Sequence, residues 1–211
     1  MNLDQTLEAL ETSVKHMGER VLSQHERCIE ILKSKDKEVA LQIVKQDEFI
    51  NRYEEDINNQ AMEQFALLNP VASDLRRVLV SIKIASELER IGDYAKGLAS
   101  FIIKSKTSRE EELIEHAAKM EENFTKMLKA ALDAYANNDV EQAFEVTKSD
   151  AKIDALYQEF KIKLQENIDI TIQDAFYLSG LFRNIERSGD HTINICEHIV
   201  YLVKGVQYDF D

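Results

Sequence analysis

Two short segments repeat one acidic pattern, Glu-Arg-x-Gly-Asp, at residues 89–93 and 186–190. Residues four positions apart lie on the same face of a helix, so the two carboxylates of each segment repel each other. The repulsion grows when the pair loses contact with water. A positive group is therefore expected next to each pair, which consists of Glu89 with Asp93 and of Glu186 with Asp190.

Two further acids stand at unexpected places on other predicted helices. Asp47 interrupts an apolar stripe that includes Ile43 and Ile50, and Asp150 is followed one turn later by Asp154. In an antiparallel bundle these acids could face the repeated pairs. Oxygen-only clusters of this kind suit divalent or trivalent ions such as Mg, Mn, Ca, Fe or Zn. The predicted ligands are Asp150, Asp154, Glu186 and Asp190 in one cluster, and Asp47, Asn51, Glu89 and Asp93 in the other.

The two clusters are not equivalent, because Asn51 stands where the second has Asp154. An amide offers a carbonyl oxygen but no charge, so we expect the first site to bind metal more weakly. A simpler interpretation is that all these acids form ion pairs with Lys and Arg on adjacent helices or reach solvent. Their recurrence at equivalent positions favours the metal interpretation. Gly92 and Gly189 also recur, and close helix packing or a ligand would explain them equally well.

Other side chains are weaker candidates. His25 lies three residues before Cys28 and could share a metal with it, although packing is the more common role of such a pair. His191 could add a nitrogen ligand to the second cluster or form a hydrogen bond nearby. Arg90 projects from the helix away from Glu89 and Asp93, and so does Arg187 from its pair. These two arginines are candidates to brace a helix or meet a partner.

The spacing of apolar residues predicts six helices in two sets of three. The first set covers Leu7–Ile31, Ile43–Phe65 and Val71–Lys104, with a turn at 33–36 and a break at Asn69-Pro70. After a linker at 106–109, the second set covers Leu113–Tyr135, Val140–Asp169 and Thr171–Lys204, with Gly205 as the stop.

The two sets are copies of one unit. Met17 aligns with Met120 and Asp47 with Asp150, both 103 positions apart, whereas the acidic segments align 97 positions apart. The sequence therefore predicts an all-α protein made of two tandem, pseudo-symmetric three-helix bundles, packed side by side. The expected units are residues 1–105 and 109–206, followed by a tail at 207–211. Each helix of ~30 residues should be about 45 Å long.

Composition narrows the range of partners. With 39 acidic and 26 basic residues, the net charge of −13 repels phosphate backbones, so no nucleic-acid partner is expected. No segment has the pattern of a signal peptide or a membrane span, which predicts a cytoplasmic protein. Cys28 and Cys196 lack a C-x-x-C spacing and are expected to be small buried side chains rather than a disulfide. An acidic helical surface is compatible with a monomer or a homodimer.

The sequence resembles the PhoU family of bacterial phosphate-signalling proteins. The resemblance rests on residues 89–95, on residues 184–191 and on the P-x-x-x-D-L-R stretch from Pro70 to Arg76. It implies a cytoplasmic regulator that reaches the membrane through a phosphate ABC transporter ATPase and a sensor histidine kinase, and represses the phosphate-starvation response. It also implies that the E/D-x-x-x-D pairs bind metal clusters, with Asp47 and Asn51 departing from the motif. Arg76, Arg90 and Arg187 are candidates for partner binding.

Two other functions compete with this non-enzymatic adaptor. One is a ferritin-like di-metal redox enzyme, also a helical bundle with inward carboxylates, but that class uses Glu-x-x-His pairs. None of the five histidines has a Glu three positions before it. The other is a helical scaffold without metal.

Overall fold

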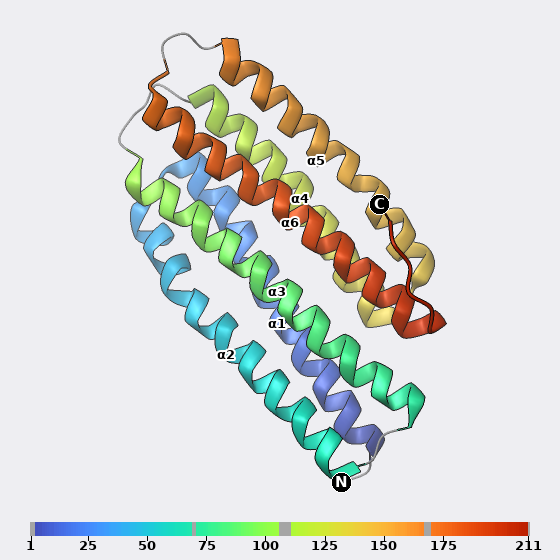
Figure 1. Cartoon of the computed structure of the whole chain (residues 1–211). Helices are drawn as coiled ribbons and strands as arrows, with labels where there is room; N and C mark the ends of the chain where they lie inside the picture. Colours follow the sequence, from blue (N-terminus) through green and yellow to red (C-terminus); the bar gives the residue numbers. More distant parts are fainter. Residues whose placement is uncertain (1–2, 69–70, 106–110, 167–169, 211) are drawn as a thin grey trace.

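The computed structural model describes residues 3–68, 71–105, 111–166 and 170–210, and it places six α-helices in them. They form two antiparallel bundles of three (Figure 1). The first bundle contains α1 (Leu3–Ser34), α2 (Lys37–Leu68) and α3 (Ala72–Lys104), and the second contains α4 (Glu111–Asn137), α5 (Val140–Glu166) and α6 (Ile172–Lys204). The predicted fold class is confirmed. None of the described helices is long and apolar enough to cross a membrane.

The same tight turn joins the first two helices of each bundle. Lys35 and Asn138 adopt a left-handed backbone with φ of 58° and 53°. The following residue caps the next helix: the Oδ1 atom of Asp36 accepts from the backbone N–H of Val39, and that of Asp139 from the N–H of Gln142. These turns lie 103 positions apart in the sequence, so the predicted duplication extends to the details of the caps.

The bounds of α6 also agree with the sequence. Thr171 caps its start by accepting from the N–H of Asp174, and Gly205 ends it with a φ of 70°. The predicted break at Asn69-Pro70 and the linker at 106–109 lie outside the described residues.

The bundles pack side by side, α1 against α4 and α3 against α6, as Figure 1 shows. Their apolar side chains form one core that continues from one bundle into the other. Small residues permit the close approach, because a Cβ atom at Gly18 of α1 would lie only 2.5 Å from Cδ2 of Leu132 on α4. Both cysteines are buried and free, as predicted.

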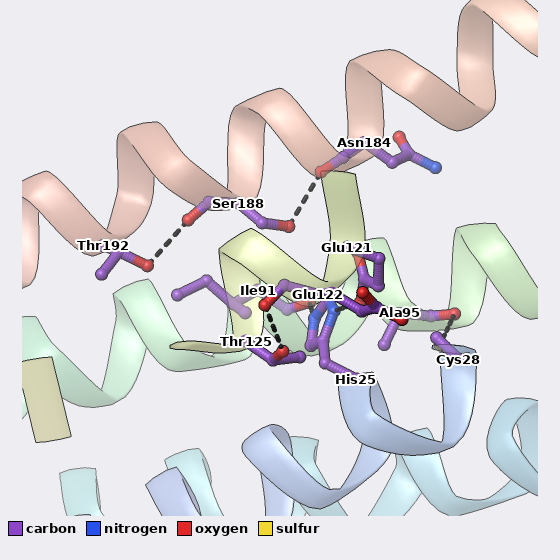
Figure 2. A network of polar contacts seen from close by, with 10 residues as sticks. All are labelled: His25, Cys28, Ile91, Ala95, Glu121, Glu122, Thr125, Asn184, Ser188 and Thr192. Atoms are coloured by element: carbon purple, nitrogen blue, oxygen red, sulfur yellow. Dashed lines mark hydrogen bonds and ion pairs between the residues drawn. The ribbon is translucent and has the colours of Figure 1, made fainter. Parts of the chain in front are cut away.

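A buried polar pair joins the bundles. His25 of α1 and Glu121 of α4 have fully buried side chains, and Nδ1 of His25 lies 2.5 Å from Oε1 of Glu121. Nε2 of the same ring is 2.8 Å from the carbonyl oxygen of Ile91 on α3, so His25 contacts two neighbouring helices at once (Figure 2). Because both nitrogens have acceptors, His25 has no free position for a metal shared with Cys28. The sequence could not reveal this pair, since its members are 96 positions apart.

A second polar network joins α3 to α6. Glu87 of α3 accepts hydrogen bonds from Nδ1 of His191 at 2.6 Å and from the amide of Asn194 at 3.2 Å, and Nε2 of His198 lies 3.7 Å from it. Burial alone would raise the pKa of Glu87, but the hydrogen bonds from these three side chains lower it to about 2. His191 therefore lies between the bundles and not in the second acidic cluster, which agrees with its predicted alternative role as a hydrogen-bonding residue.

Removing Glu121 should be costly, because it leaves His25 buried without its carboxylate partner. We expect Glu121→Ala to lower the free energy of unfolding by about 3–5 kcal/mol, measured by urea denaturation. Glu122→Ala breaks only the solvent-exposed ion pair with Lys33 and should cost at most about 1 kcal/mol. The double variant His25→Leu/Glu121→Leu should lose less free energy of unfolding than the single variants His25→Leu and Glu121→Leu lose together. Full additivity of the two losses would contradict a coupling between His25 and Glu121.

Candidate functional site

The residues predicted to form the second cluster come from α5 and α6, which pack against each other. Asp150 of α5 is 9% exposed and lies against the backbone of α6. A Cβ atom at Gly189 would be 2.5 Å from Oδ1 of Asp150 and 3.4 Å from Cδ1 of Ile153. Close helix packing thus accounts for this glycine. Gly92 has the equivalent contact in the first bundle, where a Cβ atom would lie 3.2 Å from Cγ2 of Ile50.

Burial and mutual repulsion both disfavour the charged forms of the acids in the second cluster. Burial raises the pKa of Asp150 to about 7, and the nearby charges of Asp154, Asp190 and Glu186 add to the effect. Burial likewise raises the pKa of Glu186, helped by Asp190 and Asp154 and opposed by Arg187 and Lys161. Within the described residues, none of Asp150, Asp154 and Glu186 forms an ion pair with a basic side chain. For these three acids, the described part of the chain thus provides no basic side chain within ion-pair distance.

The first cluster contains a basic side chain in direct contact with its most buried acid. Asp47 of α2 is 3% exposed, and its Oδ2 atom accepts a 2.7 Å hydrogen bond from Nζ of Lys96 on α3. The same ammonium lies 3.7 Å from Oδ1 of Asp93. The simpler interpretation of the sequence, that the acids pair with a basic residue of an adjacent helix, therefore describes Asp47. Its other oxygen, Oδ1, is buried and has no hydrogen-bond partner.

The remaining members of the first cluster lie at its margin. Burial raises the pKa of Glu89, and Asp93 and Glu54 raise it further against the opposing charge of Arg90. Asn51 is exposed on α2 and, in the described part of the chain, makes no hydrogen bond to these acids. Sequence reasoning missed Glu54, although it lies seven residues after Asp47 and therefore on nearly the same helix face.

Apart from the buried Asp47 and Asp150, the acids lie on the margin of each bundle and not in its core. Glu89 and Glu186 are half-buried, whereas Asp154 and Asp190 are exposed. Leu75 precedes Glu89 on the same helix face, and it is also exposed. Among the described residues, no three His, Cys, Asp or Glu side chains are arranged so that they could hold a metal ion. Metal binding in the second cluster would thus require its side chains to move closer together.

The three arginines predicted to bind partners each contact a different residue. Arg76 lies over the ring of Tyr201, 5.7 Å from its centroid, and so connects α3 to the end of α6. Arg90 is exposed, with Nε 3.7 Å from Oε2 of Glu89. The pKa of Arg187 is raised chiefly by its interaction with Tyr94 of the other bundle.

The raised pKa of Asp150 predicts a pH-dependent stability. Between its ordinary pKa of 3.8 and the folded value of about 7, the folded chain holds the proton more tightly than the unfolded chain, so stability falls as pH rises. Asp150→Asn removes this penalty. In the presence of a chelator, we expect the Tm of Asp150→Asn to exceed that of the wild type by more at pH 8 than at pH 5. Asp133→Asn, at an exposed position of α4, is the control, and an equal difference at both pH values would contradict the prediction.

Comparison with known proteins supports the duplicated architecture. The PhoU domain model matches the chain twice, at residues 14–102 and 117–199. The two matches start 103 positions apart and end 97 positions apart, which are the offsets found within the sequence.

Relatives of known family match over nearly the full chain. The phosphate-specific transport system accessory protein PhoU homolog of Clostridium acetobutylicum is 31% identical over 97% of this chain and 95% of its own length. The accessory protein PhoU of Escherichia coli is 32% identical over 96% of this chain and 85% of its own length.

Two solved structures have the same fold as this chain. The phosphate transport system regulatory protein PhoU from Streptococcus pneumoniae superposes with a TM-score of 0.92 at 29% identity, covering 99% of this chain and 100% of the other. PhoU from Pseudomonas aeruginosa gives a TM-score of 0.87 at 30% identity, covering 97% and 100%. The chain therefore belongs to the PhoU family.

Proposed function

We propose that this protein is a regulatory accessory protein of phosphate-specific transport. It acts by docking and not by catalysis: it connects the ATPase of a phosphate ABC transporter to a sensor histidine kinase and keeps the phosphate-starvation response repressed while phosphate is plentiful. The observation that carries the proposal is the match of both repeats to the PhoU domain. Relatives that match nearly the whole chain are named accessory proteins of this transport system.

The proposal includes a metal site in the second bundle. Asp150, Asp154, Glu186 and Asp190 would hold the ion, a donor set that suits hard or borderline cations such as Mn²⁺, Mg²⁺ or Fe. The fit is supported by Asp150, which is buried near three other acids and itself forms no ion pair with a basic side chain in the described part of the chain. A bound cation would offset the repulsion between Asp150 and the acids of α6.

A ferritin-like enzyme is the less favoured alternative. Such an enzyme needs imidazole ligands beside its carboxylates. Here His25 is occupied by Glu121 and a backbone carbonyl, His191 by Glu87, and Nε2 of His116 by the carbonyl oxygen of Leu156. These histidines support the structure of the bundles and are not directed at the acidic clusters.

The metal site can be tested by elemental analysis. We expect protein purified without added metal, then equilibrated with Mn²⁺ and dialysed, to retain Mn²⁺, and Glu186→Ala/Asp190→Ala to lose it together with the metal-dependent rise in Tm. Glu141→Ala/Glu145→Ala removes an exposed i,i+4 acidic pair from α5 and should leave both unchanged. Unchanged metal content and Tm in the Glu186/Asp190 variant would argue for a scaffold without metal.

The regulatory role can be tested in the organism from which the protein comes. Deleting the gene should raise the expression of phosphate-scavenging genes in phosphate-rich medium, because the kinase is no longer inhibited. The wild-type gene should restore repression. If repression persists in the deletion strain, the regulatory proposal is wrong, whatever the metal content of the purified protein.

A further inference from the structure

Besides Asn51 and Asp154, the two acidic clusters differ at a second position, next to the repeated acidic segments. Lys96 follows Asp93 by three residues on α3, and the equivalent position on α6, 97 residues later, is Ile193. Lys96 directs its ammonium at two carboxylates, whereas Ile193 packs against the hydrophobic core. The first half of the protein therefore carries a covalently attached cation where the second half carries an apolar side chain.

The ammonium lies where an ion shared by the two helices would have to lie. Nζ of Lys96 is 2.7 Å from Oδ2 of Asp47 on α2 and 3.7 Å from Oδ1 of Asp93 on α3, and it thus bridges the two helices. Asp47 is almost completely buried, and its Oδ1 atom has no hydrogen-bond partner. A buried carboxylate with an unused oxygen can accept a further positive ligand once the lysine is withdrawn.

We propose that Lys96 serves as a built-in cation of the first cluster, so that only the second cluster depends on metal. This inference rests on the metal site that we propose for the second half. A divalent ion could enter the first cluster only by displacing the ammonium from Asp47 or by accepting a repulsive positive neighbour. Lys96 thus determines which half of a duplicated protein responds to metal.

An ordinary surface ion pair is the competing explanation. Lys96 is 42% exposed, and exposed ion pairs contribute little to stability. An ordinary ion pair predicts that removing Lys96 changes neither metal content nor the effect of metal on stability. The built-in cation predicts that both change, so metal binding distinguishes the two explanations.

The test replaces Lys96 with an uncharged side chain of similar length. We expect Lys96→Met to retain more Mn²⁺ per chain than the wild type and to bind it in the first half about tenfold or more tightly, because a unit positive charge has left the site. Its Tm should rise more on addition of Mn²⁺ than that of the wild type. Lys83→Met, at an exposed position of the same helix, is the control and should behave like the wild type. Lys96→Gln is the second variant if Lys96→Met folds poorly by circular dichroism.

Metal binding by the first half is measured separately in the Glu186→Ala/Asp190→Ala variant, whose second cluster is disabled. Mn²⁺ retained by the triple variant with Lys96→Met, but not by the background alone, would place the added metal in the first half and support the inference. If the wild type retains Mn²⁺ and Lys96→Met retains no more, the inference is overturned while the proposed function stands. If the wild type retains none and Lys96→Met does, the proposed metal site fails and the role of Lys96 stands.

The reciprocal exchange tests the same idea in the second half. Ile193→Lys places an ammonium next to the second cluster, and we expect its Mn²⁺ content to fall below that of the wild type. Ile193→Met keeps an apolar side chain at the same position and should retain the wild-type content. Equal Mn²⁺ retention by Ile193→Lys and Ile193→Met would overturn the inference.

Discussion

The burial of neighbouring carboxylates at helix contacts is the constraint on which both halves depend. The acids recur because the unit is duplicated, and the glycines beside them let the neighbouring helix approach. Once Asp47 and Asp150 are buried against that helix, their charge must be compensated or suppressed. The first half compensates it with an ammonium, whereas in the second half the carboxyl group of Asp150 has a pKa of about 7. The difference between the halves is therefore electrostatic, within one common backbone.

The sequence was sufficient for the fold because the relevant signals are local. Apolar residues at helical spacing mark the helices, and the left-handed residues and caps of the turns at Lys35 and Asn138 lie within a few positions of one another. The two alignment offsets identified the duplication, and the double PhoU domain match has the same offsets. The proposed domain boundaries stay predictions, as does the ligand role of the acids.

The features that the sequence did not predict depend on contacts between distant residues. His25 and Glu121 meet across the two bundles, and Glu87 meets His191, because the α1–α4 and α3–α6 packing fixes their register. Lys96 was overlooked for the same reason. Its partner Asp47 is on another helix, and only the spatial arrangement shows which of many lysines reaches it. Spacing identifies acids that share a face, but it does not identify the counter-charge from the next helix.

The interface between α3 and α6 has a pseudo-twofold relation that follows from the duplication. Tyr94 and His191 are equivalent residues, and they contact each other, with the hydroxyl oxygen of Tyr94 3.3 Å from Nε2 of His191. Glu87 and Asn184 are also equivalent, and so are Gly97 and Asn194. Glu87 accepts a hydrogen bond from Asn194. Asn184 instead packs against the backbone of Gly97, because a Cβ atom at Gly97 would lie only 2.3 Å from Nδ2 of Asn184. Equivalent positions of the two halves thus form different contacts across this interface.

Helix α6 takes part both in the second acidic cluster and in the interface between the bundles. One of its faces carries Glu186 and Asp190 toward α5, and the next residue, His191, is hydrogen-bonded to Glu87 on α3. A helix behaves as a stiff rod over this length, so a shift that draws α6 toward α5 also pulls on the hydrogen bonds between the bundles. Metal binding between α5 and α6 would then also affect the interface between α3 and α6, which joins the two bundles.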